Sequence, residues 1–519
     1  MRKNNEKILL YMGLCLAVLP VILLRDFTPA NELRYLSLAE EALREHRWWA
    51  FTNQGEVFAD KPPLYLWIVM LGKCLFGSHQ MWFLSLFSLI PAVMIVRIMD
   101  HWVSHELDTD SRSLACMMLT TAGLFLGLAV TLRMDLLMCL FVVLAMRAFW
   151  RMKYVPQQRR REQWLFPLYI FLAMFTNGVV GLFVPLFSTL VYLWMKGRMR
   201  TLAYYWGWRT WSVLAVLSAV WLGMAYVEGG SGYLHHMLVD QMGILFHADI
   251  HDRPFYFYLA TIWYSFAPYS IFVAAILVTV LRPDFVRTEL QRYFLCITLT
   301  TFVAISCVSS KLQVYMLPAF PFMVYAAAMA LPRVKMNAWY RATISLPAMA
   351  FALALPALVV MVVGDIYPLL NDTLCYITAT GVSVSGIYAL RLVYKHADYT
   401  GLTDAVRVLG LGLLFAVFVG GWSMPRLNPG LGYGALCAKA AELSEKTGIT
   451  HFVAYDLRRP SHMDVYLHTS VGRIDDEKQL DKLLYEGKPA IVMLPQKVLK
   501  RFPAQNVHVV GPYAVIVVK

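Results

Sequence analysis

The chain has 519 residues, of which 59% are hydrophobic and 15% are charged, and its mean hydropathy is +0.55. This composition excludes an assembly of soluble domains and predicts an α-helical polytopic membrane protein. The formal net charge of +13 is spread over short loops between apolar segments, a distribution typical of membrane topology that argues against nucleic-acid binding.

Apolar segments of about 17–25 residues recur along the chain, each long enough to cross roughly 30 Å of hydrocarbon. After the first, Arg25-Asp26-Phe27 stands in place of a small-residue cleavage site, so we expect an uncleaved span with its amino end in the cytoplasm. Basic residues predict a cytoplasmic loop around Val155. About thirteen spans fit between such loops, at residues 8–24, 80–98, 113–131, 134–152, 164–177, 179–195, 210–227, 257–281, 293–309, 312–331, 342–363, 372–391 and 404–422.

The loop of residues 25–79 is expected on the non-cytoplasmic face with two helices in the membrane interface. Residues 33–49 have apolar side chains at helical spacing, charges on the other face and two terminal tryptophans, which predicts a helix on the membrane surface. Residues 62–76 are interpreted as an interfacial helix, because a true span there would reverse every later segment and move the arginines at 159–161 outside.

The composition changes at residue 423. We therefore predict a transmembrane domain at 1–422 and a small α/β domain at 423–519, which an odd number of spans places outside the cytoplasm. Strand-like runs alternate with helical stretches in the second domain, with strands at 452–455, 490–494 and 507–518 and helices at 436–446 and 477–485.

This topology gathers polar clusters on the non-cytoplasmic face. Acids and bases from distant parts of the chain suit a charged, lipid-linked substrate, because Lys or Arg binds phosphate and a carboxylate orients or deprotonates a nucleophile. The clusters are Asn31 and Glu32 with Arg34; Asp60 with Lys61; Arg133 with Asp135; and His251 and Arg253 with Lys311.

Each of these residues also has a purely structural explanation. Asp135 at the start of a span suits a helix cap or a salt bridge, and Lys61 before two prolines suits a side chain that snorkels to the interface. His251 alone suits an interfacial loop histidine. Asp60 and His251 are also candidates for a shared divalent metal, although two ligand types without a characteristic spacing are weak evidence. The gathering of these residues on one side of the membrane favours a functional site over separate structural roles.

Ordered motifs add a family resemblance over about the first 330 residues. They read NELRY at 31–35, DKPPLYLW at 60–67, RMDL at 133–136, TNGVVG at 176–181, HDRPFYFY at 251–258 and SKLQVYMLPAFP at 310–321. In this order they resemble the GT-C membrane glycosyltransferases, specifically the bacterial aminoarabinose-transferase-like branch, which is related to the protein O-mannosyltransferases.

The resemblance implies an inverting glycosyltransferase of the bacterial inner membrane with a periplasmic site and carboxy-terminal domain. It implies transfer of a sugar, such as 4-amino-4-deoxy-L-arabinose, from a polyprenyl-phosphate donor to lipid A or another envelope acceptor, with no certain cofactor. The implied catalytic residues are Glu32, Asp60 and Asp135, and the implied substrate-binding residues are Asn31, Arg34, Lys61, Arg133, His251, Arg253, Lys311 and Tyr315.

Two departures from the family pattern bear on the chemistry. The family's first motif usually begins Asp-Glu, whereas Asn31 precedes Glu32 here, and an amide is no general base. We therefore expect another carboxylate to act as the base, or an acceptor phosphate that is already ionised; a weak or inactive relative is the third explanation. The family's Thr-Lys-Gly is Thr176-Asn177-Gly178, which loses a phosphate contact.

Functions of other classes remain alternatives. A transporter or flippase for a lipid-linked sugar predicts polar sites at mid-membrane, whereas these acids and bases lie at span ends. A protein O-glycosyltransferase would use the same donor with a different acceptor. A membrane anchor for the carboxy-terminal domain leaves the charges of the first loop unexplained.

Overall fold

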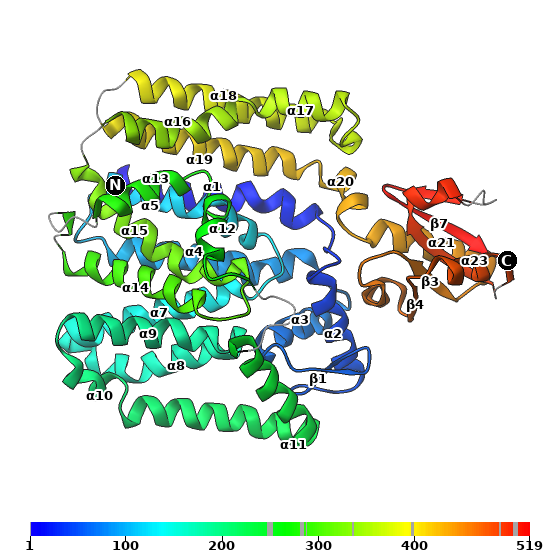
Figure 1. The fold of residues 1–519 in the computed structure, drawn as a ribbon, viewed down its shortest axis with the longest axis horizontal. Coiled ribbons are helices and arrows are strands. Elements are labelled where there is room, and N and C mark those ends of the chain that lie inside the picture. Colours follow the sequence, from blue (N-terminus) through cyan, green and yellow to red (C-terminus); the bar gives the residue numbers. More distant parts are fainter. Residues whose placement is uncertain are drawn as a thin grey trace.

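A computed structural model describes residues 2–246, 253–280, 285–286, 288–334, 337–395, 399–486, 489–501 and 507–518. Long helices run side by side through most of the molecule, and a small sheet domain lies beyond one end of them (Figure 1). The helices of the bundle are α1 (Arg2–Leu24), α4 (Met81–Trp102), α5 (Thr109–Thr120), α6 (Gly123–Ala129), α7 (Asp135–Tyr154), α8 (Arg159–Asn177), α9 (Val180–Met195), α11 (Trp208–Phe246), α12 (Phe257–Ser265), α13 (Ser270–Val280), α14 (Glu289–Ser306), α15 (Phe320–Ala330), α16 (Ala338–Ala352), α17 (Ala354–Val363), α18 (Thr373–Lys395) and α19 (Tyr399–Gly421).

Helices occupy every segment that the sequence predicts to span the membrane. Three of these segments, 113–131, 257–281 and 342–363, are each broken into two helices. Among the described residues, six helices are long and apolar enough to cross a membrane, or up to seven if the pair α5 and α6, bent by 67°, counts as one span. The predicted helical bundle is therefore present, but its predicted number of spans is not confirmed.

The break between α5 and α6 has a local cause. The Thr121 hydroxyl donates to the carbonyl of Met117 at 2.6 Å, and the amide of Gly123 leaves the helix and donates to the carbonyl of Ala267 at 2.9 Å. Polar side chains that compete for helix carbonyls bend helices in this way. The bend turns α6, and the loop that follows it approaches the first loop of the chain.

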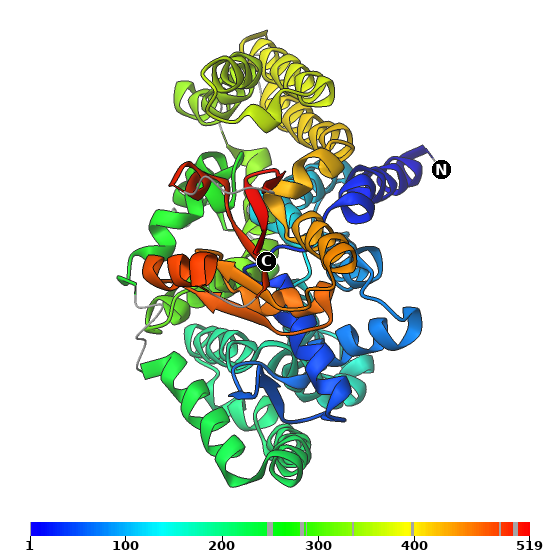
Figure 2. The ribbon, with the colours of Figure 1, turned by 90° about the vertical axis from the view of Figure 1, so that its right-hand side faces the viewer.

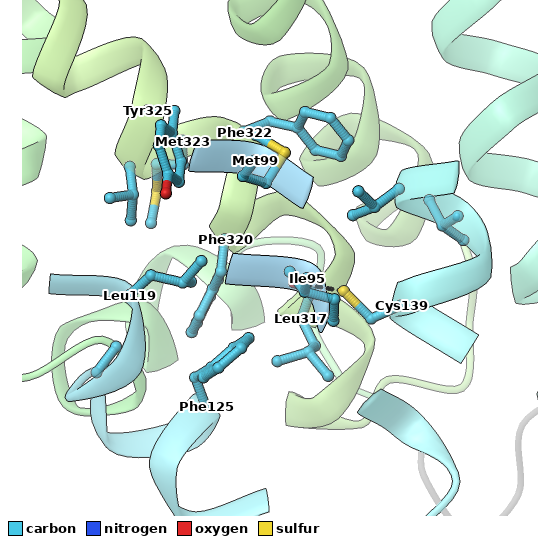
Figure 3. Packing of buried hydrophobic residues seen from close by; sticks show 14 of the residues in the cluster. Ile95, Met99, Leu119, Phe125, Cys139, Leu317, Phe320, Phe322, Met323 and Tyr325 are labelled. Carbon is cyan, nitrogen blue, oxygen red and sulfur yellow. Dashed lines mark hydrogen bonds between the residues drawn. The ribbon is translucent and has the colours of Figure 1, made fainter. Parts of the chain in front are cut away.

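Large apolar side chains from α4, α5, α7 and α15 fill the centre of the bundle (Figure 3). Phe320 and Phe322 are fully buried there, and the Sγ atom of Cys139 lies 3.8 Å from the carbonyl oxygen of Leu317. Small residues such as Ala326 and Ala327 let neighbouring helices approach α15 closely. This packing holds α7 in position, and α7 carries Asp135 at its start.

The first loop forms two helices and a hairpin. The predicted surface helix at 33–49 is α2 (Glu32–Arg44), and the predicted interfacial helix at 62–76 is α3 (Pro63–Phe76). Between them, β1 (Phe51–Asn53) pairs antiparallel with β2 (Glu56–Phe58), a hairpin that the sequence analysis missed. Its tight turn has positive φ at Gln54 (58°) and Gly55 (81°), a geometry that glycine favours.

Helix α2 differs from the prediction of a helix on the membrane surface. Most of its side chains are buried, including Leu33, Leu36 and the acidic Glu32 and Glu41. It packs between α3 and the carboxy-terminal domain. The amphipathic pattern is therefore real, but protein rather than lipid covers its apolar face.

The carboxy-terminal domain contains a five-stranded sheet with strand order β4-β3-β5-β7-β6. Strand β3 is parallel to β4 and β5, whereas β7 is antiparallel to β5 and β6. The predicted strand at 507–518 is a hairpin, and β4 was missed. The elements are α20 (Met424–Leu431), α21 (Gly434–Thr447), β3 (Phe452–Tyr455), η7 (Pro460–Met463), α22 (Asp464–Leu467), β4 (Val471–Ile474), α23 (Glu477–Glu486), β5 (Ala490–Pro495), β6 (Val507–Val510) and β7 (Tyr513–Val518).

The sheet domain shares one hydrophobic core with α2 and α3, and Figure 2 shows it in front of that end of the bundle. Asp26, two residues after the end of α1, stabilises this contact. Its carboxylate accepts hydrogen bonds from the amide of Gly434 at 2.8 Å and the hydroxyl of Tyr466 at 2.6 Å. A Cβ atom at position 434 would lie 2.7 Å from Asp26 Oδ2, so a larger residue there would displace the carboxylate from this contact. The first loop and the carboxy-terminal domain therefore pack as one layer.

Candidate active site

Glu32 is the buried hub of the first loop, with only 1% of the residue exposed. Both of its oxygens accept hydrogen bonds from the Arg25 guanidinium, at 2.7 and 2.6 Å. The amide and hydroxyl of Thr28 and the amide of Leu132 complete its shell, at 2.7, 2.9 and 2.8 Å. Burial alone would raise the pKa of Glu32, but the hydrogen bonds and charge of Arg25 outweigh it and hold the pKa below its ordinary value. Glu32 therefore joins the first loop to the loop before α7.

A row of polar side chains links three distant segments. Lys61 Nζ donates to Asn177 Oδ1 at 3.1 Å, and Asn177 Nδ2 donates to Asp135 Oδ1 at 3.2 Å. Asp135 Oδ2 in turn accepts from Arg133 Nε at 2.7 Å. The order Lys61–Asn177–Asp135–Arg133 thus joins the first loop, the end of α8 and the start of α7. We refer to these four residues as the polar row.

The polar row is mostly sheltered from solvent. Asp135 is 1% exposed and Asn177 is 6% exposed. Burial lowers the pKa of the Lys61 ammonium below its ordinary value, and the carboxylates of Asp135 and Asp60 oppose this change. The carboxylate of Asp135 raises the pKa of the Arg133 guanidinium. The row therefore combines one carboxylate with two cations, a charge pattern suited to an anionic ligand.

Asp60 is the predicted carboxylate with the greatest exposure. Its side chain is 47% exposed and forms a salt bridge of 3.2 Å with Nη2 of Arg34. The Arg34 guanidinium also lies over the ring of Phe58, 4.3 Å from its centroid. Asp60 is thus held in place on one side, and nearly half of its side-chain surface remains accessible.

Tyrosine rings form the apolar wall beside these charges. Tyr35 and Tyr65 pack edge to face with centroids 5.7 Å apart, and both are buried. Burial raises the pKa of Tyr35 to about 12, and the charges of Arg133 and Asp135 also act on its phenol. No described residue pairs with the buried hydroxyl of Tyr65. The predicted site residue Tyr315 is buried as well.

Lys311 and Arg253 come together next to an apolar cavity. Lys311 is 6% exposed, and its Nζ atom donates to the backbone carbonyl of Arg253 at 2.9 Å. A cavity of about 690 Å³ lies among α12, α13, α14 and α15, and it is lined by Phe255 and Tyr256, which follow Arg253 after one intervening proline. Cations at the end of an apolar cavity suit a ligand with an anionic head and a hydrocarbon tail.

The remaining predictions for the site have different outcomes. Asn31 stands before α2 with its side chain exposed, and that side chain caps no amide among the described residues. His251 lies outside the described residues, so its predicted part in the site is not tested. Of the predicted metal pair only Asp60 is described, it pairs with the cation Arg34, and the described residues contain no group of three side chains that could hold a metal ion. Because His251 lies outside the described residues, the predicted metal pair stays a prediction.

Sequence reasoning missed the bridging role of Asn177 and the anchoring role of Arg25. Asn177 was noted as a lost phosphate contact, but its hydrogen bonds to Lys61 and Asp135 give it a second role. Its place in a Thr-Asn-Gly turn at a span end was the available signal. Arg25 directly follows the first span, where a lone arginine ordinarily indicates topology.

Comparisons with known proteins agree with the predicted resemblance. No protein-family profile matches the chain. An uncharacterised protein of Aquifex aeolicus is 24% identical over 303 residues, 57% of this chain and 58% of that protein, so less than two thirds of this relative is spanned. The undecaprenyl phosphate-alpha-4-amino-4-deoxy-L-arabinose arabinosyl transferase of Edwardsiella ictaluri is 23% identical over 471 residues, 86% of this chain and 82% of that protein.

The fold has a close counterpart among solved structures. The crystal structure of ArnT from Cupriavidus metallidurans bound to undecaprenyl phosphate superposes with a TM-score of 0.73 and 15% identity, covering 99% of this chain and 98% of that one. The apo structure of the same protein gives a TM-score of 0.73. The predicted resemblance to the GT-C membrane glycosyltransferases is confirmed, and the helical bundle with its carboxy-terminal sheet domain is the ArnT fold.

Proposed function

We propose that this chain transfers a sugar from a polyprenyl-phosphate donor to an acceptor of the bacterial cell envelope, with inversion at the anomeric carbon. The names of the relatives support 4-amino-4-deoxy-L-arabinose as the sugar, and lipid A on the periplasmic face is the proposed acceptor. The observation that carries the proposal is the polar row, in which three of the motifs behind the resemblance meet at one end of the bundle.

The donor's tail is proposed to occupy the cavity among α12, α13, α14 and α15, with its phosphate near Lys311, Arg253 and Lys61. When the glycosidic bond breaks, the polyprenyl phosphate leaves with an additional negative charge. Cations fixed before the reaction stabilise such charge without reorganisation, which is commonly the largest contribution to catalysis. Lys311 is well prepared for this role because the Arg253 carbonyl already holds its ammonium at 2.9 Å.

The carboxylates are proposed to have different roles. Asp60 is the one that contacts substrate, because its side chain is half-exposed beside the polar row. Glu32 and Asp135 act as positioning residues, since the oxygens of both already accept hydrogen bonds from neighbouring segments. An acceptor phosphate would be ionised at neutral pH and would need orientation rather than deprotonation, which agrees with Asn31 at the family's acidic position.

Transfer can be tested with the purified protein in lipid nanodiscs. The assay supplies undecaprenyl phosphate-linked aminoarabinose and lipid A, and mass spectrometry follows the gain of the sugar. We expect transfer by the natural protein and a loss of about 100- to 1,000-fold in Lys311→Ala, with melting temperature and membrane insertion unchanged. Lys439→Ala, at a partly exposed ion pair in α21, is the control and should behave like the natural protein.

Two results would contradict the proposal. Normal turnover by Lys311→Ala would overturn the phosphate contact. Absence of any sugar transfer by the natural protein, together with movement of the donor across a bilayer, would favour the transporter. A comparison of lipid A masses between a strain that lacks the chain and its parent tests the sugar and the acceptor in the cell.

A further inference from the structure

The carboxy-terminal domain places an arginine against the first loop. Arg459, directly before η7, has a left-handed backbone (φ 53°), and its Nη1 atom donates to the carbonyl of Ala30 at 2.6 Å. Ala30 immediately precedes Asn31, whose side chain is exposed. Segment η7 packs on α2, and Gln54 of the hairpin donates to the carbonyl of Ser461 within η7 at 3.4 Å. A guanidinium from the sheet domain is thus fixed at the start of α2.

Arg34, in the first turn of α2, brings a second guanidinium to the same end of this helix, four residues after Ala30 in the sequence. Its salt bridge with Asp60 and its stacking on Phe58 fix the position of the group, and 27% of its side chain is exposed. In both arginines, only some of the guanidinium N–H groups bind neighbouring residues. An arginine has five N–H donors, so each keeps donors for a ligand.

The charges of the two arginines act on each other. Partial burial, followed by the positive charges of Arg34 and Arg458, lowers the pKa of Arg459. Burial and the charges of Arg459 and Arg34 lower the pKa of His462 to about 4. His462 is 3% exposed, and its Nδ1 atom has no partner among the described residues. Three guanidinium groups, those of Arg34, Arg458 and Arg459, thus act on one another at this contact between the domains, where the carboxylates of Asp60 and Asp464 are also present. An anion bound between the arginines would be stabilised by their charge.

We infer that Arg34 and Arg459 form a phosphate-binding subsite for the acceptor, at the contact between α2 and the carboxy-terminal domain. The inference rests on the proposed function, which it deepens by naming the groups that hold the acceptor's phosphate: one guanidinium from α2 and one from the carboxy-terminal domain. Two guanidinium groups suit a phosphate because their paired N–H donors match its oxygens. The carboxy-terminal domain would then contribute directly to substrate recognition.

The acceptor, rather than the donor, is the source of this phosphate for two reasons. A polyprenyl-phosphate sugar has a single phosphate, which the proposed function assigns to Lys311, Arg253 and Lys61 on other segments of the chain. Asp60 pairs with Arg34, so an acceptor held by Arg34 lies beside the carboxylate that is proposed to orient it. A phosphate bound there would be next to the exposed Asn31.

Binding without turnover tests the inference. The natural protein, Arg459→Gln and Arg459→Lys are purified in phosphatidylcholine nanodiscs without donor, and binding of lipid A is compared with binding of the same lipid after phosphatase treatment. Arg459→Gln keeps an N–H donor for the Ala30 carbonyl but removes the charge. Arg473→Ala, at an exposed ion pair on β4 of the same domain, is the matched control. Binding of undecaprenyl phosphate is measured in parallel.

We expect Arg459→Gln to weaken binding of phosphorylated lipid A about 10- to 100-fold, to leave the dephosphorylated lipid and undecaprenyl phosphate unaffected, and to be partly rescued by Lys. An equal loss for both forms of lipid A would indicate a structural role and overturn the inference, as would no loss. Loss of undecaprenyl phosphate binding alone would assign the phosphate to the donor and also overturn it. Because no transfer is required, failure of the proposed function would appear separately, as absent transfer with intact binding.

Discussion

Both ends of the helical bundle carry a polar network, and the two networks differ in how their charges are used. At the far end of α7, Glu289 accepts hydrogen bonds from the Tyr192 hydroxyl at 2.6 Å and the Lys196 ammonium at 2.7 Å. Tyr192 lies in α9 and Lys196 directly follows it, and α9 packs against α14, which begins at Glu289. At the end near the sheet domain, Asp135 and Lys61 meet through Asn177, and these groups come from loops and helix ends far apart in the sequence.

The difference shows when charges at a helix end indicate a site. Glu289 joins adjacent helix ends, and its ion pair with Lys196 stabilises their packing. The polar row also stabilises packing, but it lies next to Asp60, whose side chain is half-exposed. A binding site requires charges that are fixed by the fold and still accessible to a ligand.

The largest effect is expected from Glu32→Gln, which tests whether the network near the sheet domain depends on its buried hub. The amide cannot accept the paired hydrogen bonds of Arg25, so a buried guanidinium loses its counter-ion. Breaking a buried ion pair on one side costs about 3–5 kcal/mol. We expect a large fall in melting temperature and loss of transfer. Glu56→Gln on the exposed part of β2 is the control, and equal melting of the two variants would contradict the hub role.

A pH effect is expected from His462, at the contact between the sheet domain and α2. Its pKa is about 4 in the folded protein and 6.5 ordinarily, so between these values the unfolded chain binds more protons than the folded one. The contribution of the neutral His462 side chain to the free energy of unfolding is therefore fully present above pH 6.5. It is lost as the pH decreases through this window, by on the order of 3 kcal/mol in total.

Thermal melting between pH 7.5 and 4 measures this effect. His462→Gln should remove most of the pH dependence, whereas His451→Gln, at an exposed position of the same domain, should retain it. A natural protein with the same melting temperature at pH 5 and pH 7.5 would refute the prediction.

Local patterns in the sequence were sufficient for most elements of the fold. Apolar periodicity predicted α2, α3 and the bundle helices, and the alternation of strands and helices predicted the sheet domain. The hairpin after α2 was missed because its strands have three residues each, too few for a periodic signal. The protein cover on α2 was missed because amphipathicity does not distinguish lipid from a protein partner.

The site was only partly predictable for a related reason. The sequence indicated Lys61 and Asp135 as charges at span ends, but their link through Asn177 joins residues 116 and 42 positions apart. Arg459 and Ala30 are 429 positions apart. Contacts of this range depend on how the helices pack, which local periodicity does not specify.

A smaller effect is expected from Asn177→Ala, which removes the centre of the polar row. Lys61 and Asp135 would keep their charges but lose their shared partner, so the ammonium would no longer be fixed toward the donor. We expect a fall in kcat of about 10- to 100-fold, since misplacement by about 1 Å can have this effect, with little change in melting temperature. Asn371→Ala, at an exposed loop position, is the control. Unchanged kcat would mean that the row is only structural.

The smallest effect is expected from Glu289→Gln, at the opposite end of the bundle. Its ion pair with Lys196 is only partly sheltered, with 26% of the Lys196 side chain and 30% of the Glu289 side chain exposed. The loss of stability should therefore be about 1 kcal/mol, and sugar transfer should stay within about twofold of the natural rate because no proposed substrate contact lies there. The contrary result would be transfer by Glu289→Gln reduced as much as in Asn177→Ala, with an unchanged melting temperature. That result would mean that the accessibility of charged side chains does not identify which end of the bundle is catalytic. The catalytic end of the bundle would then have to be reassigned.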